Sequence, residues 1–216
     1  MLPEFFSSKP SLKICGVTTL ADATHLAELG VSALGINFWP PSKRYCSPKK
    51  ASTIVSHVAG DILRVGVFVN NSRPLALDLF DECLIDVVQL HGDESPDDIS
   101  FFLNQNIPVI RAVSATKLPD YELPRENFAL LIDTPAGSDY GGTGKTFDWS
   151  LARDFAQGHP QIPLILAGGL TPDNAAEALN TVHPAALDIA SGAEISPGIK
   201  DLDKVRALLT LVNQDS

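Results

Sequence analysis

Eight short runs of apolar and β-branched residues constrain the fold of this 216-residue chain more than any other feature. Each run begins about 20 to 35 residues after the one before it, which is the length of one strand plus one crossover helix. Nearly apolar strands are typical of a parallel sheet that is covered on its outside. We therefore expect strands at residues 12–15, 33–38, 64–69, 86–90, 108–113, 128–132, 163–167 and 186–190.

Helical patterns fill most of the segments between these runs. Residues 19–29 begin with threonine caps, continue with apolar residues every three to four positions, and stop at Gly30. Thr171 followed by Pro172 is typical of a cap that precedes proline at the first helical position. Residues 201–212 carry the last helical pattern, so strand and helix alternate along the chain.

Eight units in this order predict an α/β fold, a single (β/α)8 TIM barrel. We expect one domain over residues 1–216, in which residues 1–11 form a lead-in segment. The weakest unit lies between the fifth and sixth strands, where Pro119 and Pro124 bracket a segment with poor helical periodicity. We predict a short or irregular fifth helix there.

Net charge and cysteine content limit the partners and the compartment. The formal net charge is −10, whereas a nucleic-acid-binding surface needs clustered Lys and Arg, so we expect no nucleic acid but allow a small phosphorylated substrate. Cys15, Cys46 and Cys83 have no CxxC spacing, which favours a reducing cytoplasm. No run of about 18 apolar residues predicts a membrane span.

Polar residues and glycines recur at the ends of the predicted strands. In a β/α barrel these ends meet at the rim that carries function, whereas the opposite rim is mostly structural. Gly168 and Gly169 follow the seventh strand, and Ser191 and Gly192 follow the eighth. Such glycines can merely turn the chain, but two clusters after the last two strands favour phosphate binding through main-chain N–H groups.

Two strand ends carry groups suited to proton transfer. By residue type alone Cys15 is more often a packing group, but Lys13 lies on the same strand face and can favour the thiolate, which makes Cys15 a candidate general base. Asp133 follows an apolar run and is either a loop anchor or a carboxyl whose pKa is raised by partial desolvation. The second interpretation makes it a candidate general acid.

Further polar residues are candidates for substrate binding. Arg44 is either a solvated loop residue or a bidentate ligand of a substrate carboxylate, and Asp188 needs a partner and can meet substrate hydroxyls. The segment 139–146 resembles a nucleotide phosphate loop, but an aspartate stands at its first glycine position, so we expect a lid with Gly141 and Gly142 or a mobile surface loop. We expect His91, Cys46 and Cys83 to be structural.

Seven ordered motifs resemble those of the phosphoribosylanthranilate isomerase family. They are Lys-Ile-Cys-Gly at 13–16, Ser-Lys-Arg-Tyr at 42–45, Gly-Val-Phe-Val-Asn at 66–70, Val-Gln-Leu-His-Gly at 88–92, Gly-Gly-Thr-Gly at 141–144 with Phe-Asp-Trp at 147–149, Ala-Gly-Gly-Leu at 167–170, and Ser-Gly-Ala-Glu at 191–194 with Pro-Gly-Ile-Lys-Asp at 197–201. The resemblance covers nearly the whole chain. It departs from the family at Asn37, where an apolar residue is usual, and at Ala190, where serine is common.

The resemblance implies a barrel enzyme of tryptophan biosynthesis that uses neither cofactor nor metal; the sequence leaves open whether it is a monomer or a homodimer. It implies an Amadori rearrangement in which Asp133 protonates the ribose ring oxygen and Cys15 removes the C2 proton. It also implies that Arg44 holds the anthranilate carboxylate. The alternatives are another phosphosugar barrel enzyme, such as indoleglycerol-phosphate synthase or the histidine-pathway isomerase, and a non-catalytic phosphate-binding barrel. Cys15 argues against the histidine-pathway enzyme, which has a carboxylate there.

Overall fold

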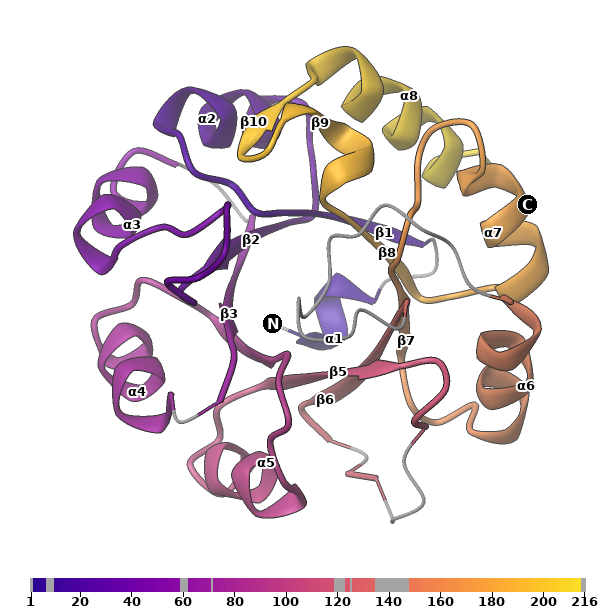
Figure 1. Cartoon of the computed structure of the whole chain (residues 1–216), viewed down its shortest axis with the longest axis horizontal. Helices are drawn as coiled ribbons and strands as arrows, with labels where there is room; N and C mark the ends of the chain where they lie inside the picture. The colour runs from indigo at the N-terminus through magenta and orange to yellow at the C-terminus, as the bar shows by residue number, and fades with distance from the viewer. Residues whose placement is uncertain are drawn as a thin grey trace.

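Eight parallel strands form a closed barrel in chain order (Figure 1). The computed structural model describes residues 2–6, 10–58, 62–70, 72–118, 123–124, 126–134 and 148–214. The predicted fold is confirmed, and every strand end lies within one residue of its predicted position. The strands are β1 Ser11–Cys15, β2 Ala33–Asn37, β3 Leu63–Phe68, β4 Val87–Leu90, β5 Val109–Ser114, β6 Phe128–Asp133, β7 Leu164–Leu166 and β8 Ala186–Ile189.

Helices surround the barrel as an outer ring (Figure 1). Among the described residues between β5 and β6 there is no helix, so the crossover predicted to be short or irregular contributes none to the described ring. The outer helices are α2 Leu20–Glu28, α3 Pro48–Val55, α4 Arg73–Asp81, α5 Pro96–Leu103, α6 Ser150–Gly158, α7 Ala175–Val182 and α8 Leu202–Val212.

Side-chain caps set several helix starts. The Thr19 hydroxyl accepts a hydrogen bond from the Asp22 N–H at 3.0 Å, as the predicted start of α2 requires. The prediction that Thr171 caps α7 is wrong, because that helix begins at Ala175. The Asn174 side chain instead accepts from the Thr171 N–H and donates to the Gly169 carbonyl, so this turn belongs to the loop after β7.

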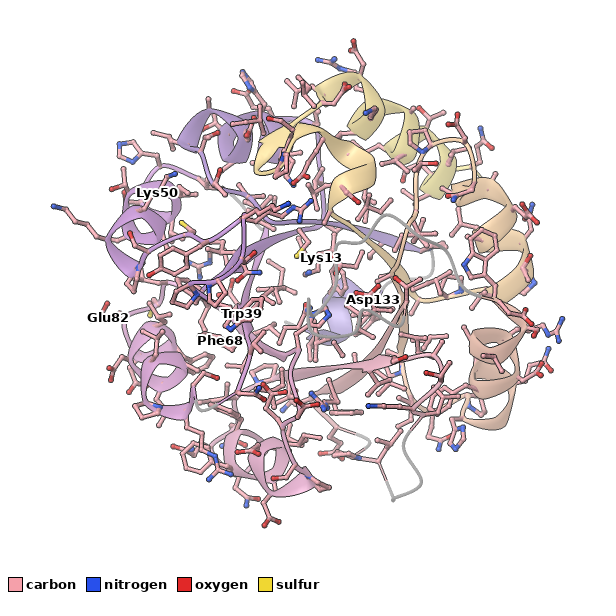
Figure 2. All side chains as sticks on the ribbon, in the orientation of Figure 1. Lys13, Trp39, Lys50, Phe68, Glu82 and Asp133 are labelled. Atoms are coloured by element: carbon pink, nitrogen blue, oxygen red, sulfur yellow. The ribbon has the colours of Figure 1, made fainter. Side chains whose placement is uncertain are left out.

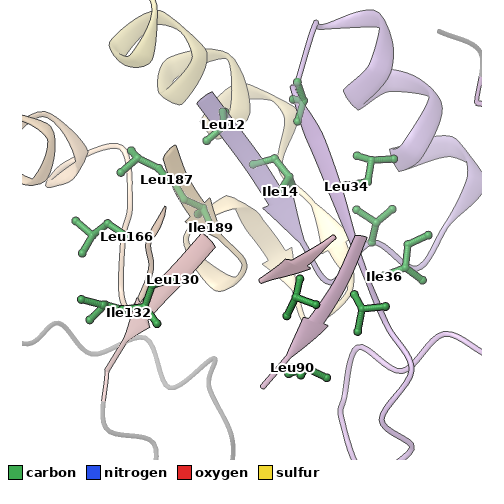
Figure 3. Close-up of a cluster of buried hydrophobic side chains, with 14 of the residues drawn as sticks. Leu12, Ile14, Leu34, Ile36, Leu90, Leu130, Ile132, Leu166, Leu187 and Ile189 are labelled. Atoms are coloured by element: carbon green, nitrogen blue, oxygen red, sulfur yellow. The ribbon is translucent and has the colours of Figure 1, made fainter. Parts of the chain in front are cut away.

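Strand alternation divides the apolar residues into two layers. Residues such as Leu12, Leu34 and Leu130 point outward and pack beneath the helices (Figure 3). Their neighbours Ala33 and Leu131 belong to a second cluster inside the barrel. Because the period is two, every alternate residue of a strand points into the barrel, up to its C-terminal end.

The lead-in segment contains a short helix, α1 Leu2–Phe5, which was not predicted from the sequence. Leu2 and Phe5 are buried in the inner cluster, and α1 lies at the centre of the ring in Figure 1. The Ser11 hydroxyl donates to the Phe5 carbonyl, which ties α1 to the start of β1. The helix therefore closes the N-terminal end of the barrel.

A small hairpin follows β8 at the opposite end. It begins with a turn of 3-10 helix at Ser191–Ala193 and comprises β9 Glu194–Ser196 and β10 Ile199–Lys200. The Thr18 hydroxyl donates to the Gly198 carbonyl at 2.7 Å, which fixes the hairpin over the loop after β1. Within the described part of the chain, every helix is too short or too polar to cross a membrane.

Candidate active site

A cavity of 640 Å³ opens at the C-terminal end of the barrel. It gathers predicted site residues from five separate segments of the sequence. Gly192 is not part of its wall, and Gly141 and Gly142, with the rest of the predicted lid, lie outside the described residues. The predicted residues that line it are Cys15, Arg44, Asp133, Gly168, Gly169, Asp188 and Ser191.

A buried ion pair lies beneath Cys15. Lys13 and Asp188 are register partners on β1 and β8, and Lys13 Nζ lies 2.8 Å from Asp188 Oδ1. Lys13 is fully buried; burial lowers its pKa, but Asp188 and the hydrogen-bonded Cys15 outweigh this and raise the pKa overall. Asp188 therefore has the partner that a carboxylate within an apolar strand needs. Lys13 stays charged beside Cys15.

Burial controls the Cys15 thiol. Desolvation raises its pKa, the charges of Lys13 and Lys200 lower it, and Asp188 raises it, so the pKa lies above its ordinary value. The predicted proximity of Lys13 and Cys15 is confirmed, but the cation does not overcome the burial. The thiol is therefore the favoured form of Cys15 in this structure.

Gly35 provides the space for this arrangement. It is the register partner of Cys15 on β2, and a Cβ at this position would lie 2.7 Å from Cys15 Sγ and 3.0 Å from Lys13 Nζ. Only glycine leaves room for both side chains on this part of the inner wall.

Asp133 is buried at the end of β6 and contacts His91. His91 Nε2 lies 3.4 Å from Asp133 Oδ2, and the Thr134 N–H donates to Oδ1 at 2.7 Å. Burial alone raises the pKa of Asp133, but the bonds from His91 and Thr134 outweigh it, so the pKa lies below its ordinary value. Desolvation acts in the predicted direction, but the predicted net rise of this pKa is wrong.

His91 is a site residue for which a structural role was predicted from the sequence. It lines the cavity, and its Nδ1 lies 2.9 Å from Nε2 of the fully buried Gln89. The amide donor on Nδ1 leaves the His91 proton on Nε2, which faces Asp133. The sequence signal for a site role was its position directly after β4, on the face that points into the barrel.

Arg44 reaches the cavity from the loop after β2, where Glu194 holds it. Arg44 Nε and Nη2 lie 2.9 and 2.7 Å from the two carboxylate oxygens of Glu194. Lys200 Nζ lies 2.8 Å from Glu194 Oε1, and both side chains are buried. Neither Glu194 nor Lys200 was predicted as a functional residue from the sequence, because only the hairpin places them beside Arg44.

The loops after β7 and β8 present main-chain donors. Gly168 and Gly169 have φ of +86° and +63°, and a Cβ at Gly192 would collide with the Leu170 carbonyl, so the two loops pack closely. In the described part of the chain, the N–H groups of Gly168, Gly169, Ser191 and Gly192 donate to no other residue. Clustered free N–H groups form an anion-binding surface.

The two departures from the family motifs both lie on the cavity wall. The Asn37 side chain accepts a hydrogen bond from the Trp39 N–H at 2.9 Å, which shapes the start of the loop that carries Arg44. Ala190 follows β8 and carries no hydroxyl. No group of three or more metal-ligating side chains occurs among the residues that the structure describes.

A closed β/α barrel with a thiol, a carboxylate and an anion-binding loop pair at one end defines an acid–base enzyme for a small anionic substrate. Residues 12–210 match the family model described as N-(5'phosphoribosyl)anthranilate (PRA) isomerase. The chain belongs to this family. The predicted family, isomerase class and role in tryptophan biosynthesis are confirmed.

Two relatives with this name cover most of the chain. The protein from Syntrophus aciditrophicus is 43% identical over 94% of this chain and 87% of its own length. The protein from Thermotoga neapolitana is also 43% identical, over 92% of this chain and 96% of its own.

Solved structures agree. The phosphoribosyl anthranilate isomerase of Thermotoga maritima superposes with a TM-score of 0.79 at 34% identity, over 94% of this chain and 98% of its own. A further phosphoribosyl anthranilate isomerase structure, in complex with reduced 1-(o-carboxyphenylamino)-1-deoxyribulose 5-phosphate, has a TM-score of 0.76 at 34% identity over 94% of this chain and 98% of its own.

Proposed function

We propose that this cavity converts N-(5'-phosphoribosyl)anthranilate to 1-(2-carboxyphenylamino)-1-deoxyribulose 5-phosphate, with Asp133 as general acid and Cys15 as general base. The observation that carries the assignment is that both side chains line one cavity, between the guanidinium of Arg44 and the N–H groups of the loops after β7 and β8. A substrate with a carboxylate at one end and a phosphate at the other fits these two anchors. The ligand named for the solved relative has the same two groups.

In the first step, Asp133 delivers a proton to the ribose ring oxygen. The bond between C1 and this oxygen breaks, the anthranilate nitrogen supplies its electron pair, and a protonated imine forms. Because the pKa of Asp133 lies below its ordinary value, its carboxyl must take up a proton from water before each turnover, while the adjacent His91 Nε2–H orients it.

In the second step, Cys15 as the thiolate removes the proton from C2. The electron pair of the C–H bond forms the C1–C2 double bond, and the imine electrons return to nitrogen, which gives an enolamine. The enolamine then tautomerises: C1 gains a proton and the C2 hydroxyl loses one, which leaves the ketone. Lys13 lies where its charge favours the thiolate during this step.

Two separate groups of residues bind the two anionic ends of the substrate. The main-chain N–H groups of Gly168, Gly169, Ser191 and Gly192 bind the phosphate. Arg44 binds the carboxylate. Asp188 faces the cavity near Cys15 and accepts from a ribose hydroxyl.

The protein works in the cytoplasm as a monomer or a homodimer. Free Cys15, Cys46 and Cys83 support a reducing compartment. One solved relative, from Thermotoga maritima, is described as monomers generated from a dimeric phosphoribosylanthranilate isomerase, which supports either assembly.

The test is the loss of anthranilate-type fluorescence when purified protein meets freshly generated phosphoribosylanthranilate. The wild type should turn over, and Cys15→Ala and Asp133→Asn should each lose at least ~100-fold in kcat with unchanged folding. Cys83→Ala is the matched control, because this thiol is exposed and remote from the cavity lining. Near-normal turnover by either site variant would remove the role assigned to it.

A further inference from the structure

The hairpin β9–β10 contacts both Cys15 and, through Glu194, Arg44. Lys200 Nζ lies 2.8 Å from Glu194 Oε1 and 2.5 Å from the main-chain oxygen of Cys15. Glu194 in turn holds Arg44. One ammonium group therefore contacts both the carboxylate that orients the predicted substrate anchor and the residue that carries the predicted base.

We infer that Lys200 is a positioning residue for the isomerisation, which orients Arg44 through Glu194 and holds Cys15 through its carbonyl. The inference rests on the proposed function, because it takes the roles of Arg44 and Cys15 from there. It adds two residues, Lys200 and Glu194, to the machinery of the reaction.

The geometry around Arg44 leaves its side chain little freedom. Two of its nitrogens bind the two oxygens of Glu194, and its aliphatic stem packs against Gly16, where any Cβ would collide with Arg44 Cδ. Arg44 Nη1 bonds to no other described residue. Nε and Nη2 thus bind Glu194, and Nη1 is the nitrogen available to a substrate carboxylate.

Charge explains why Glu194 needs a second cation. Arg44 and Glu194 alone form a neutral pair, which attracts an anionic substrate weakly. Lys200 adds one positive charge, so the group of three side chains has a net positive charge beside Arg44. It also supplies a partner for a buried carboxylate, since Glu194 is only 6% exposed.

The same ammonium acts on Cys15 from above the barrel. The charged groups that face this thiol are Lys13 from β1, Asp188 from β8, Arg44 from the loop after β2 and Lys200 from β10. Lys13 is paired with Asp188 inside the barrel. Lys200 is therefore the cation that couples the thiol to Arg44 and Glu194.

Two measurements on the full-length protein test the inference. The first is kcat and KM for phosphoribosylanthranilate. The second is the pH dependence of Cys15 alkylation by iodoacetamide, followed by mass spectrometry of the peptide, in a Cys83→Ser background. Lys50→Met is the matched control, since Lys50 lies outside the barrel on α3 (Figure 2).

Lys200→Met should raise KM and lower kcat, with kcat/KM down at least about tenfold, and should slow Cys15 alkylation at pH 8 about tenfold. Glu194→Gln should raise KM similarly but speed alkylation, because a negative charge is lost. Lys200→Arg keeps the charge and should restore part of both values. A merely structural lysine would not move alkylation in opposite directions in the two variants.

Wild-type kcat, KM and alkylation profiles in Lys200→Met would overturn the inference, as would equal alkylation rates in Lys200→Met and Glu194→Gln. If Lys200→Met does not fold, Lys200→Arg and Glu194→Gln carry the test, since both nearly conserve volume. A wild-type protein that does not turn over the substrate would instead refute the proposed function. The alkylation profiles would then still decide whether Lys200 acts on Cys15.

Discussion

Lys13 and Asp188 face each other across the seam where the first strand of the barrel meets the last, with Lys13 Nζ 2.8 Å from Asp188 Oδ1. Both point inward, directly below Cys15 on the same strand face (Figure 2 shows Lys13 inside the ring of strands). The pair therefore lies where the first and last strands join, and both of its charges act on the Cys15 thiol.

Removal of Lys13 should destabilise the fold, because Asp188 loses its partner. Lys13→Met leaves the Asp188 carboxylate buried without a partner, so we expect a loss of about 3 to 5 kcal/mol in the free energy of unfolding, measured by urea denaturation. The double variant Lys13→Met with Asp188→Leu should recover much of this loss. A single variant as stable as the wild type would show that the pair is not a desolvated ion pair.

Arg44→Ala should weaken substrate binding more than it slows the chemistry. Loss of a charge-assisted hydrogen bond to the substrate corresponds to a KM increase of roughly 10- to 100-fold with a smaller change in kcat. Arg206→Ala is the control, because Arg206 is an exposed residue of α8 that pairs with the exposed Asp203. With a substrate analogue that lacks the anthranilate carboxylate, wild type and Arg44→Ala should converge; a persistent gap would direct the carboxylate to another group.

The sequence predicted the barrel, and the places of Cys15 and Asp133 at the ends of its strands, for a physical reason. Side chains of a strand point alternately inward and outward. The local pattern therefore predicts that Cys15 and Asp133, at the ends of their apolar strands, point inward. The helical lead-in was not predicted, since four residues at the N-terminus carry no periodicity.

Residues that act through distant partners could not be predicted in this way. Glu194 meets Arg44 across 150 positions of sequence, and the contact depends on how the hairpin folds over the closed barrel. The direction of the Asp133 pKa shift was predicted wrongly for the same reason. The largest lowering effect comes from His91, which reaches Asp133 from another strand end.

The His91–Asp133 contact should make stability depend on pH. The pKa of Asp133 is lowered in the folded protein, so its contacts stabilise the fold above the unfolded-state pKa and are lost as the pH falls through the lower folded-state pKa. We expect His91→Asn to cost about 1.5 to 3 kcal/mol near neutral pH, and this difference to shrink between about pH 5 and about pH 2. Urea unfolding at several pH values measures it.

His183→Asn is the control for that series, because His183 is an exposed residue with φ of +51°, a conformation that asparagine tolerates. Its stability should follow that of the wild type at every pH. A constant difference between wild type and His91→Asn over the whole range would mean that His91 stabilises the fold by packing and not through the ionised carboxylate.

Gly35→Ala should damage the site from the neighbouring strand. The new Cβ would lie 2.7 Å from Cys15 Sγ and 2.9 Å from Cys15 Cα, which is main chain and cannot rotate away. We expect a loss of about 1 to 3 kcal/mol in the free energy of unfolding and a fall in kcat, because Cys15 is displaced.

Gly158→Ala is the matched control: no atom lies within 4 Å of its added Cβ, so stability should stay level or rise by up to about 1 kcal/mol, with unchanged kcat. Equal behaviour of the two alanine variants would show that the inner wall adjusts to a methyl group, and that Cys15 does not depend on the space at Gly35.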